Sequence, residues 1–84
     1  QDASVALVRD ALVAVASERD RALFLEVLVQ TSLGDRAASA TVARLVGMQP
    51  EAVRQQVSRI RRRLRELAAT DPRYADLAHL AIVA

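Results

Sequence analysis

Apolar residues recur at steps of three and four along most of this 84-residue chain. The first such run covers residues 4–16, where Val5, Val8, Leu12 and Val15 fall on one face of a helix. That spacing is typical of an amphipathic helix, whereas a strand would alternate apolar and polar residues. No stretch of the sequence alternates in this way, so the pattern predicts an all-α fold built as a small helical bundle.

A second helix is predicted to begin after Ser17 and to run to about Leu33. Ser17 has the side chain of an N-cap, and Asp20 stands three residues further on, as in a loose capping box. The apolar residues that follow helical spacing in this segment are Leu23, Phe24, Val27 and Leu28. Gly34 is expected to end the helix, because glycine readily takes the left-handed conformation found after helix C-termini.

Two further helices are predicted on either side of a tight turn. Ser39 is expected to cap a short helix over residues 40–46, and Gly47 ends it with the positive φ that the turn needs. Pro50 then suits the first turn of a long helix over residues 50–69, where its missing N–H would be unpaired anyway. Two helices in this order, joined by a glycine turn, form a helix-turn-helix motif. No strand pattern follows them, so we expect no winged element.

The sequence also predicts how these two helices pack. Ala43 is small, which lets the second helix of the motif approach the first closely. The residues expected to fill the space between them are Val42, Val46, Met48, Val53 and Val57. Beyond the motif, the apolar stripe of the long helix continues through Ile60, Leu64 and Leu67. One side of this helix is therefore expected to face the core along its whole length.

A fifth helix is predicted over residues 72–83, with Asp71 as its cap. It is apolar around much of its circumference, which leaves two alternatives: it packs back onto the domain, or it forms a homodimer or partner surface. Tyr74 and Phe24 are expected in the core, and His79 is expected to be partly buried or on the surface rather than a ligand. Together the helices fit one small domain that spans the whole chain.

Positive charge is concentrated on the outward side of the long helix. Residues 53–67 hold six of the twelve arginines, although the formal net charge of the chain is only +2. A small domain with one cationic face is typical of a module that binds a polyanion such as double-stranded DNA. The alternative is a plain helical bundle in which the arginines only keep a surface helix solvated.

In a helix-turn-helix motif, the N-terminal half of the second helix enters the major groove and contacts base edges. The residues there that carry suitable donors and acceptors are Arg54, Gln55, Ser58 and Arg59. The arginines further along the helix are better placed for backbone phosphates, and they are Arg61, Arg62, Arg63 and Arg65. The sequence therefore predicts a base-reading set followed by a phosphate-contacting set on one helix.

Several classes of function are disfavoured by what the sequence lacks. It has no cysteine and one histidine, so we expect no disulfide, no metal site and no cofactor. We also expect no enzyme, because there is no supported carboxylate pair, no Ser/His/Asp set and no glycine-rich phosphate loop. No run of about 18 apolar residues and no signal-peptide pattern occurs, so we expect a cytoplasmic protein without a membrane span. Because the chain begins with Gln1, we expect a fragment of a longer protein or one that has lost its start.

Residues 40–67 resemble the DNA-binding region four of bacterial sigma factors, particularly the extracytoplasmic-function group; they read ATVARLVGMQPEAVRQQVSRIRRRLREL. The matching positions are Val42-Ala43, Val46-Gly47, Val53 and the run from Ser58 to Leu64. Upstream, the segment LVAVASERDRALFLEVLV is similar to the family's helix, short break and arginine- and leucine-rich helix. The likeness covers about residues 8–67 of a single domain over residues 1–84, and the helix over 72–83 is an addition to it.

The resemblance implies a transcription factor domain that binds the −35 promoter element in double-stranded DNA and docks on the β flap of RNA polymerase. It assigns base contacts to the base-reading set and places Ser39, Thr41 and Arg44 near DNA phosphates. Members of the family are also bound by anti-sigma factors and other regulators, so a protein-interaction domain is the alternative function. Effector domains of LuxR-type response regulators are similar too, and share the Ala-Gly-Val spacing of the motif. Arginine with Gln and Ser on the outward side of the long helix favours DNA over a protein groove.

Overall fold

Helices make up most of residues 3–83, the part of the chain that the computed structural model describes. They are α1 (Ala3–Val15), α2 (Glu18–Ser32), α3 (Ala38–Val46), α4 (Pro50–Thr70) and η1 (Pro72–His79), of which the last is a 3₁₀ helix. No strand occurs within these residues. The prediction of a small all-α bundle of about five helices is therefore confirmed.

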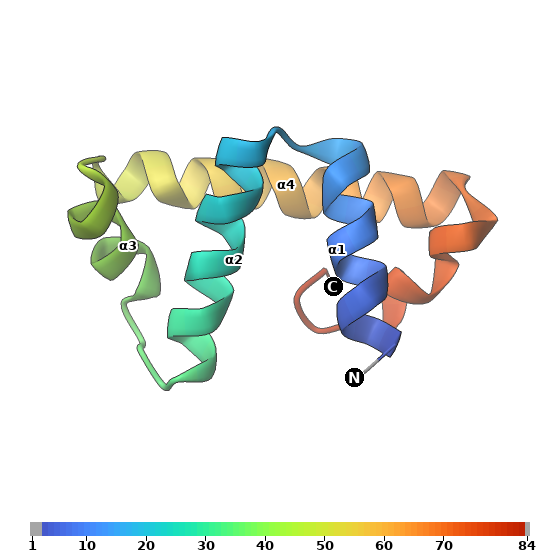
Figure 1. The fold of residues 1–84 in the computed structure, drawn as a ribbon, viewed down its shortest axis with the longest axis horizontal. Helices are drawn as coiled ribbons and strands as arrows, with labels where there is room; N and C mark the ends of the chain where they lie inside the picture. The colour runs from blue at the N-terminus through green and yellow to red at the C-terminus, as the bar shows by residue number, and fades with distance from the viewer. Residues whose placement is uncertain (1–2, 84) are drawn as a thin grey trace.

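Helix α4 is the axis on which the other elements are assembled (Figure 1). Its 21 residues span about 30 Å, which is most of the 37 Å length of the domain. Helices α1 and α2 cross it, α3 lies near its N-terminal end, and η1 folds back at its C-terminal end. Because each of these elements contacts α4, the orientation of this one helix decides which of its side chains face outward.

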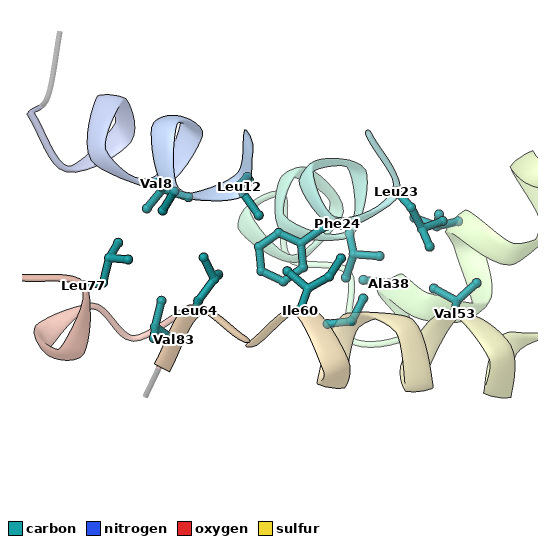
Figure 2. Packing of buried hydrophobic residues seen from close by; sticks show 14 of the residues in the cluster. Val8, Leu12, Leu23, Phe24, Ala38, Val53, Ile60, Leu64, Leu77 and Val83 are labelled. Carbon is teal, nitrogen blue, oxygen red and sulfur yellow. The ribbon is translucent and has the colours of Figure 1, made fainter. Parts of the chain in front are cut away.

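The hydrophobic core follows the apolar side of α4 (Figure 2). The residues of this stripe that are buried, as the spacing predicts, are Val53, Val57, Ile60 and Leu64. Leu67, at the end of the stripe, is half-buried. Phe24 of α2 is completely buried and lies beside Ile60 in the middle of the core. Figure 2 shows residues from α1 and the C-terminal segment around Leu64, and residues from α2 and α3 nearer Val53.

Helix α1 buries only part of the stripe that its spacing predicts. Val8 and Leu12 are buried, but Val5 is 43% exposed, so the predicted stripe is too long at its start. Val5 borders an open apolar groove that Leu28 and Leu80 also line. Ala11, which is completely buried, is the third residue that α1 contributes to the core.

The start and the end of α2 follow the sequence signals. The hydroxyl oxygen of Ser17 accepts a hydrogen bond from the backbone N–H of Asp20 at 3.2 Å, which confirms the cap. This is one half of the predicted capping box; the other half, a hydrogen bond from the Ser17 N–H to the Asp20 carboxylate, does not form. The helix ends before Gly34, which has a φ of 92°, in the region that favours glycine.

The start of α3 differs from the prediction. The helix begins before Ser39, its N-cap is Ala37, and no side chain caps it, so the expected cap at Ser39 is wrong. Asp35 supplies the missing acceptor: its carboxylate accepts hydrogen bonds from the backbone N–H of Ala37 and from the hydroxyl of Thr41. A carboxylate outside the helix thereby ties the α2–α3 connection to the first turn of α3.

The helix predicted over residues 72–83 is wrong in its length and its kind. The segment forms 3₁₀ turns to His79 and then a tight turn that ends in the core at Val83. Asp71 caps its start, as expected, by accepting a hydrogen bond from the backbone N–H of Arg73. Arg61 and Arg65 of α4 donate hydrogen bonds to the carbonyls of Ile82 and Val83 in this turn.

The C-terminal segment packs back onto its own chain, as the first of the two alternatives predicts. The homodimer or partner surface stays a prediction. Tyr74 and Leu77 are buried in the core, and the Tyr74 hydroxyl donates a hydrogen bond to the carboxylate of Asp10 in α1 at 2.6 Å. That hydrogen bond, together with burial, raises the pKa of Tyr74 above its ordinary value. His79 is exposed on the surface of the segment.

Replacing Leu64 by Ala tests how much the apolar stripe of α4 contributes to stability. Leu64 is 0% exposed, so the substitution removes apolar contacts and leaves a cavity, at a cost of about 2–5 kcal/mol in unfolding free energy. The same change at Leu33, which is 75% exposed, is expected to cost less than about 0.5 kcal/mol. Chemical denaturation of both variants measures the difference, and equal losses would contradict the packing of α4.

Candidate nucleic-acid interface

Gly47 forms the turn between α3 and α4. Its φ and ψ are 71° and 33°, and the N–H groups of Gly47 and Met48 both donate to the carbonyl of Ala43. A Cβ at this position would meet nothing within 4 Å, so backbone conformation rather than lack of space favours glycine here. Ala43 and Val53 are buried where α3 and α4 pack together. The pair of helices and the glycine turn predicted for the motif are therefore present.

One residue expected between α3 and α4 lies on the surface instead. Val46 is 50% exposed and its neighbour Leu45 is 66% exposed, because α3 ends there and no further turn covers them. Together with Met48 they border a groove at the start of α2, where Arg19 and Glu26 also lie. The outer end of the motif thus presents apolar side chains to solvent beside charged ones.

The predicted base-reading residues lie together on the outward side of α4. Arg54, Gln55, Ser58 and Arg59 are exposed, and with Glu51 and Arg62 they line one shallow hollow of roughly 370 Å³. We call these six residues the outer face. Arg54 pairs with Glu51 at 3.1 Å, but both side chains are more than half exposed, so water screens the pair and it contributes little. An incoming phosphate or base edge can therefore replace Glu51 at low cost.

The residues that the resemblance places near phosphates have different surroundings on α3. Arg44 is exposed, and its charge helps to lower the pKa of Asp35. The Thr41 hydroxyl already donates to Asp35, so it holds the α2–α3 connection. Ser39 is half-buried and lines a groove that faces α4. Ser39 and Arg44 thus remain open to an outside partner, whereas Thr41 has a structural role.

Two of the arginines predicted to contact phosphates also bind the C-terminal turn. The Arg61 Nε donates to the carbonyl of Ile82 at 3.1 Å, and an Arg65 guanidinium nitrogen donates to the carbonyl of Val83 at the same distance. Each guanidinium has five N–H donors, so one bond to a carbonyl leaves the others for a second partner. The C-terminal turn therefore orients Arg61 and Arg65 and leaves most of their N–H donors available.

The remaining two arginines of the phosphate set lie on different sides of α4. Arg62 belongs to the outer face and is exposed. Arg63 donates a hydrogen bond to the carbonyl of Val15, at the end of α1, at 3.3 Å. The predicted phosphate set is therefore divided among the outer face, the α1 side and the side that faces the C-terminal turn.

A cationic groove of roughly 890 Å³ lies between the α2–α3 connection and one side of α4. Its charged and hydroxyl-bearing side chains include Asp35, Arg36, Ser39, Arg54, Ser58, Arg61 and Arg65. The four residues from α4 follow one another at steps of four, three and four, so they form a single stripe between the outer face and the core. With four arginines and one carboxylate, this arginine groove has a formal charge of +3.

Sequence reasoning gave no role to Arg36, which lines the arginine groove. It lies in the α2–α3 connection, it is exposed, and it makes no hydrogen bond or ion pair with the rest of residues 3–83. Helical periodicity could not identify it, because it stands outside the helices. The sequence shows only that Arg36 is a basic residue shortly before the first helix of the motif. The fold adds that Arg36 lines the same groove as arginines of α4.

No protein-family model, no curated protein and no solved structure matches this chain. The likeness to sigma region four therefore rests on the residues quoted above. Over residues 3–83, no helix combines the length and the apolar character that a membrane crossing needs. In the same part of the chain, no group of three or more His, Asp or Glu residues is placed to hold a metal ion.

Asp35 connects the geometry of this site to pH. Hydrogen bonds from the Thr41 hydroxyl and the Ala37 N–H, with a smaller effect of the Arg44 charge, hold the pKa of Asp35 below its ordinary value. The ionised carboxylate therefore stabilises the fold above the ordinary pKa of about 3.9. That contribution is lost as the pH falls through the lowered pKa, because both folded and unfolded chains are then protonated.

Replacing Asp35 by Ala is expected to lower the melting temperature at neutral pH, since the first turn of α3 loses its acceptor. The melting curves of wild type and variant should converge in acid, where the wild-type carboxyl is protonated too. The control is Asp76→Ala, at an exposed carboxylate without a hydrogen bond, which should melt like the wild type. A loss at Asp35 that does not change with pH would contradict this role of the carboxylate.

Proposed function

We propose that this chain is a helix-turn-helix domain of the sigma region-four type, which binds double-stranded DNA through the N-terminal half of α4. The outer face is the observation that carries the proposal. Its residues are exposed on a helix whose opposite side is buried along its length, and the hollow that they form is lined by α4 alone. A single helix with one free, polar side has the shape that the major groove admits.

The chemistry of the outer face fits base recognition. Arg54 and Arg59 can donate two parallel hydrogen bonds to the acceptors of a guanine, and Gln55 can pair with an adenine in the same way. The Ser58 hydroxyl can donate or accept, and Arg62, further along α4, is placed for a backbone phosphate. The direction of these side chains is fixed by the buried stripe, so they can engage one groove together.

The resemblance extends the proposal from DNA binding to transcription. A region-four-like domain would bind a promoter element and, at the same time, dock on RNA polymerase. Such a role places the protein in the bacterial cytoplasm. Selection from a pool of duplexes would identify the bases that the outer face prefers.

A protein-interaction domain is the second candidate, and the apolar end of the motif favours it. Leu45 and Val46 are exposed and, with Met48, border a groove that also has charged residues from α2. Exposed apolar patches with a charged rim are typical of protein-binding surfaces. RNA polymerase, an anti-sigma factor or another regulator would be the partner. Because this groove and the outer face are separate surfaces, one domain can use both.

Binding to a pool of DNA duplexes at several salt concentrations tests the proposed function. Wild type is expected to bind with an affinity that falls steeply with salt, by a log–log slope of several units. Replacing Arg59 and Arg62 together by Ala should raise Kd by about tenfold or more, because each lost arginine contact is worth on the order of 1–3 kcal/mol. Fluorescence anisotropy of labelled duplexes measures both quantities.

The matched control replaces Arg9 and Arg19 by Ala. Both are exposed and lie on α1 and α2, so this variant loses the same charge away from the outer face and should bind nearly as wild type does. Equal losses in the two double variants would show that only net charge matters, against the proposal. Absence of wild-type binding at low salt would contradict it outright and favour the protein-interaction candidate.

A further inference from the structure

We propose that the arginine groove holds the phosphate backbone of one DNA strand, beside the bases that the outer face contacts. This inference rests on the proposed function and adds a second contact surface to it. It gives a role to Arg36, to which neither the helical pattern nor the family resemblance assigns one. The site is built from two separate parts of the chain, the α2–α3 connection and the side of α4.

The lining of the groove has the donors that a phosphodiester needs. Arg36 approaches from the connection, and Arg61 and Arg65 approach from α4, so the positive charge stands on both walls. The hydroxyls of Ser39 and Ser58 lie in the same lining. Phosphate oxygens accept strong, charge-assisted hydrogen bonds from guanidinium groups, and serine hydroxyls are common additional donors to them.

These donors are available to an outside anion. Arg36 has no bonding partner among residues 3–83, and Arg61 and Arg65 each have unused N–H groups beyond their bond to the C-terminal turn. The bonds to the turn also hold these two side chains in place, which reduces the entropy lost when a ligand binds. The carboxylate that lines the groove, Asp35, is occupied by the Ala37 N–H and the Thr41 hydroxyl.

Continuity with the outer face favours a nucleic acid strand over a small ligand. Arg54 and Ser58 line both the groove and the hollow of the outer face, so the two surfaces adjoin along α4. When a helix lies in the major groove, a sugar-phosphate backbone runs along each side of it. A strand whose bases meet the outer face would therefore have its phosphates at the groove. A free oligophosphate offers the same phosphate oxygens, so the experiment distinguishes it from a DNA strand.

Substituting Arg36 by Gln tests the inference, since this arginine is exposed and its loss breaks no bond within residues 3–83. Removing one phosphate contact should make the log–log salt slope of duplex binding shallower by about one unit. Binding should weaken equally for a duplex selected from the pool and for a scrambled one, because phosphate contacts carry no sequence information. Circular dichroism of the variant confirms that the helices are retained.

Arg9→Gln is the matched control, with the same loss of charge on the exposed side of α1. Its salt slope should equal that of wild type. If wild type binds DNA and the Arg36 variant keeps the wild-type slope, the groove is not a strand site, although the proposed function stands. If wild type shows no salt-dependent binding, both proposals fail. The two failures are therefore distinguishable in one series of titrations.

Inorganic tripolyphosphate supplies the other arm of the experiment. At matched ionic strength it should compete with a labelled duplex no better than sodium chloride does, because it cannot reach the outer face and the groove at once. Strong competition that disappears in the Arg36→Gln variant would assign the groove to a small phosphate ligand and overturn the inference. Strong competition that persists in the variant would place phosphate binding elsewhere and overturn it as well.

Discussion

The burial of one side of α4 is the constraint on which the rest of the structure depends. Each of the other elements contacts this helix, and its stripe from Val53 to Leu64 supplies the buried positions to which the others add. Without this packing, a helix with so many arginines would be solvated all round, and nothing would fix its rotation about its own axis. Packing of the stripe fixes its rotation, and with it the direction of every charged side chain.

That rotation divides the arginines of α4 into groups with different tasks. Arg59 and Arg62 are exposed in the hollow that α4 alone lines, and Arg54 lines both this hollow and the arginine groove. Arg61 and Arg65 face sideways, where they bind carbonyls of the C-terminal turn and border the arginine groove. Some arginines of α4 thus bond the C-terminal turn, and others leave positive charge exposed to solvent.

Sequence reasoning predicted the first four helices, the buried stripe of α4 and the exposure of the four residues proposed to read bases, because each depends on local periodicity. It failed where contacts distant in sequence decide the outcome. The Asp35–Thr41 hydrogen bond replaces the cap expected at Ser39. The C-terminal segment forms a turn that packs on the core and bonds to arginines of α4, where a helix was expected. Arg36 was missed for the same reason, since its position opposite α4 depends on how α3 packs. Val46, at the last position of α3, lies outside the core that its spacing predicted.

An amide chemical-shift titration of the isotope-labelled chain with a short DNA duplex at low salt is the most direct test, because it locates the contact residue by residue. The DNA-binding assignment predicts the largest shifts along α4 from Glu51 to Arg62 and in residues 36–39, with little change in α1. Shifts centred on residues 45–48 and the start of α2, or no shifts at all, would contradict it.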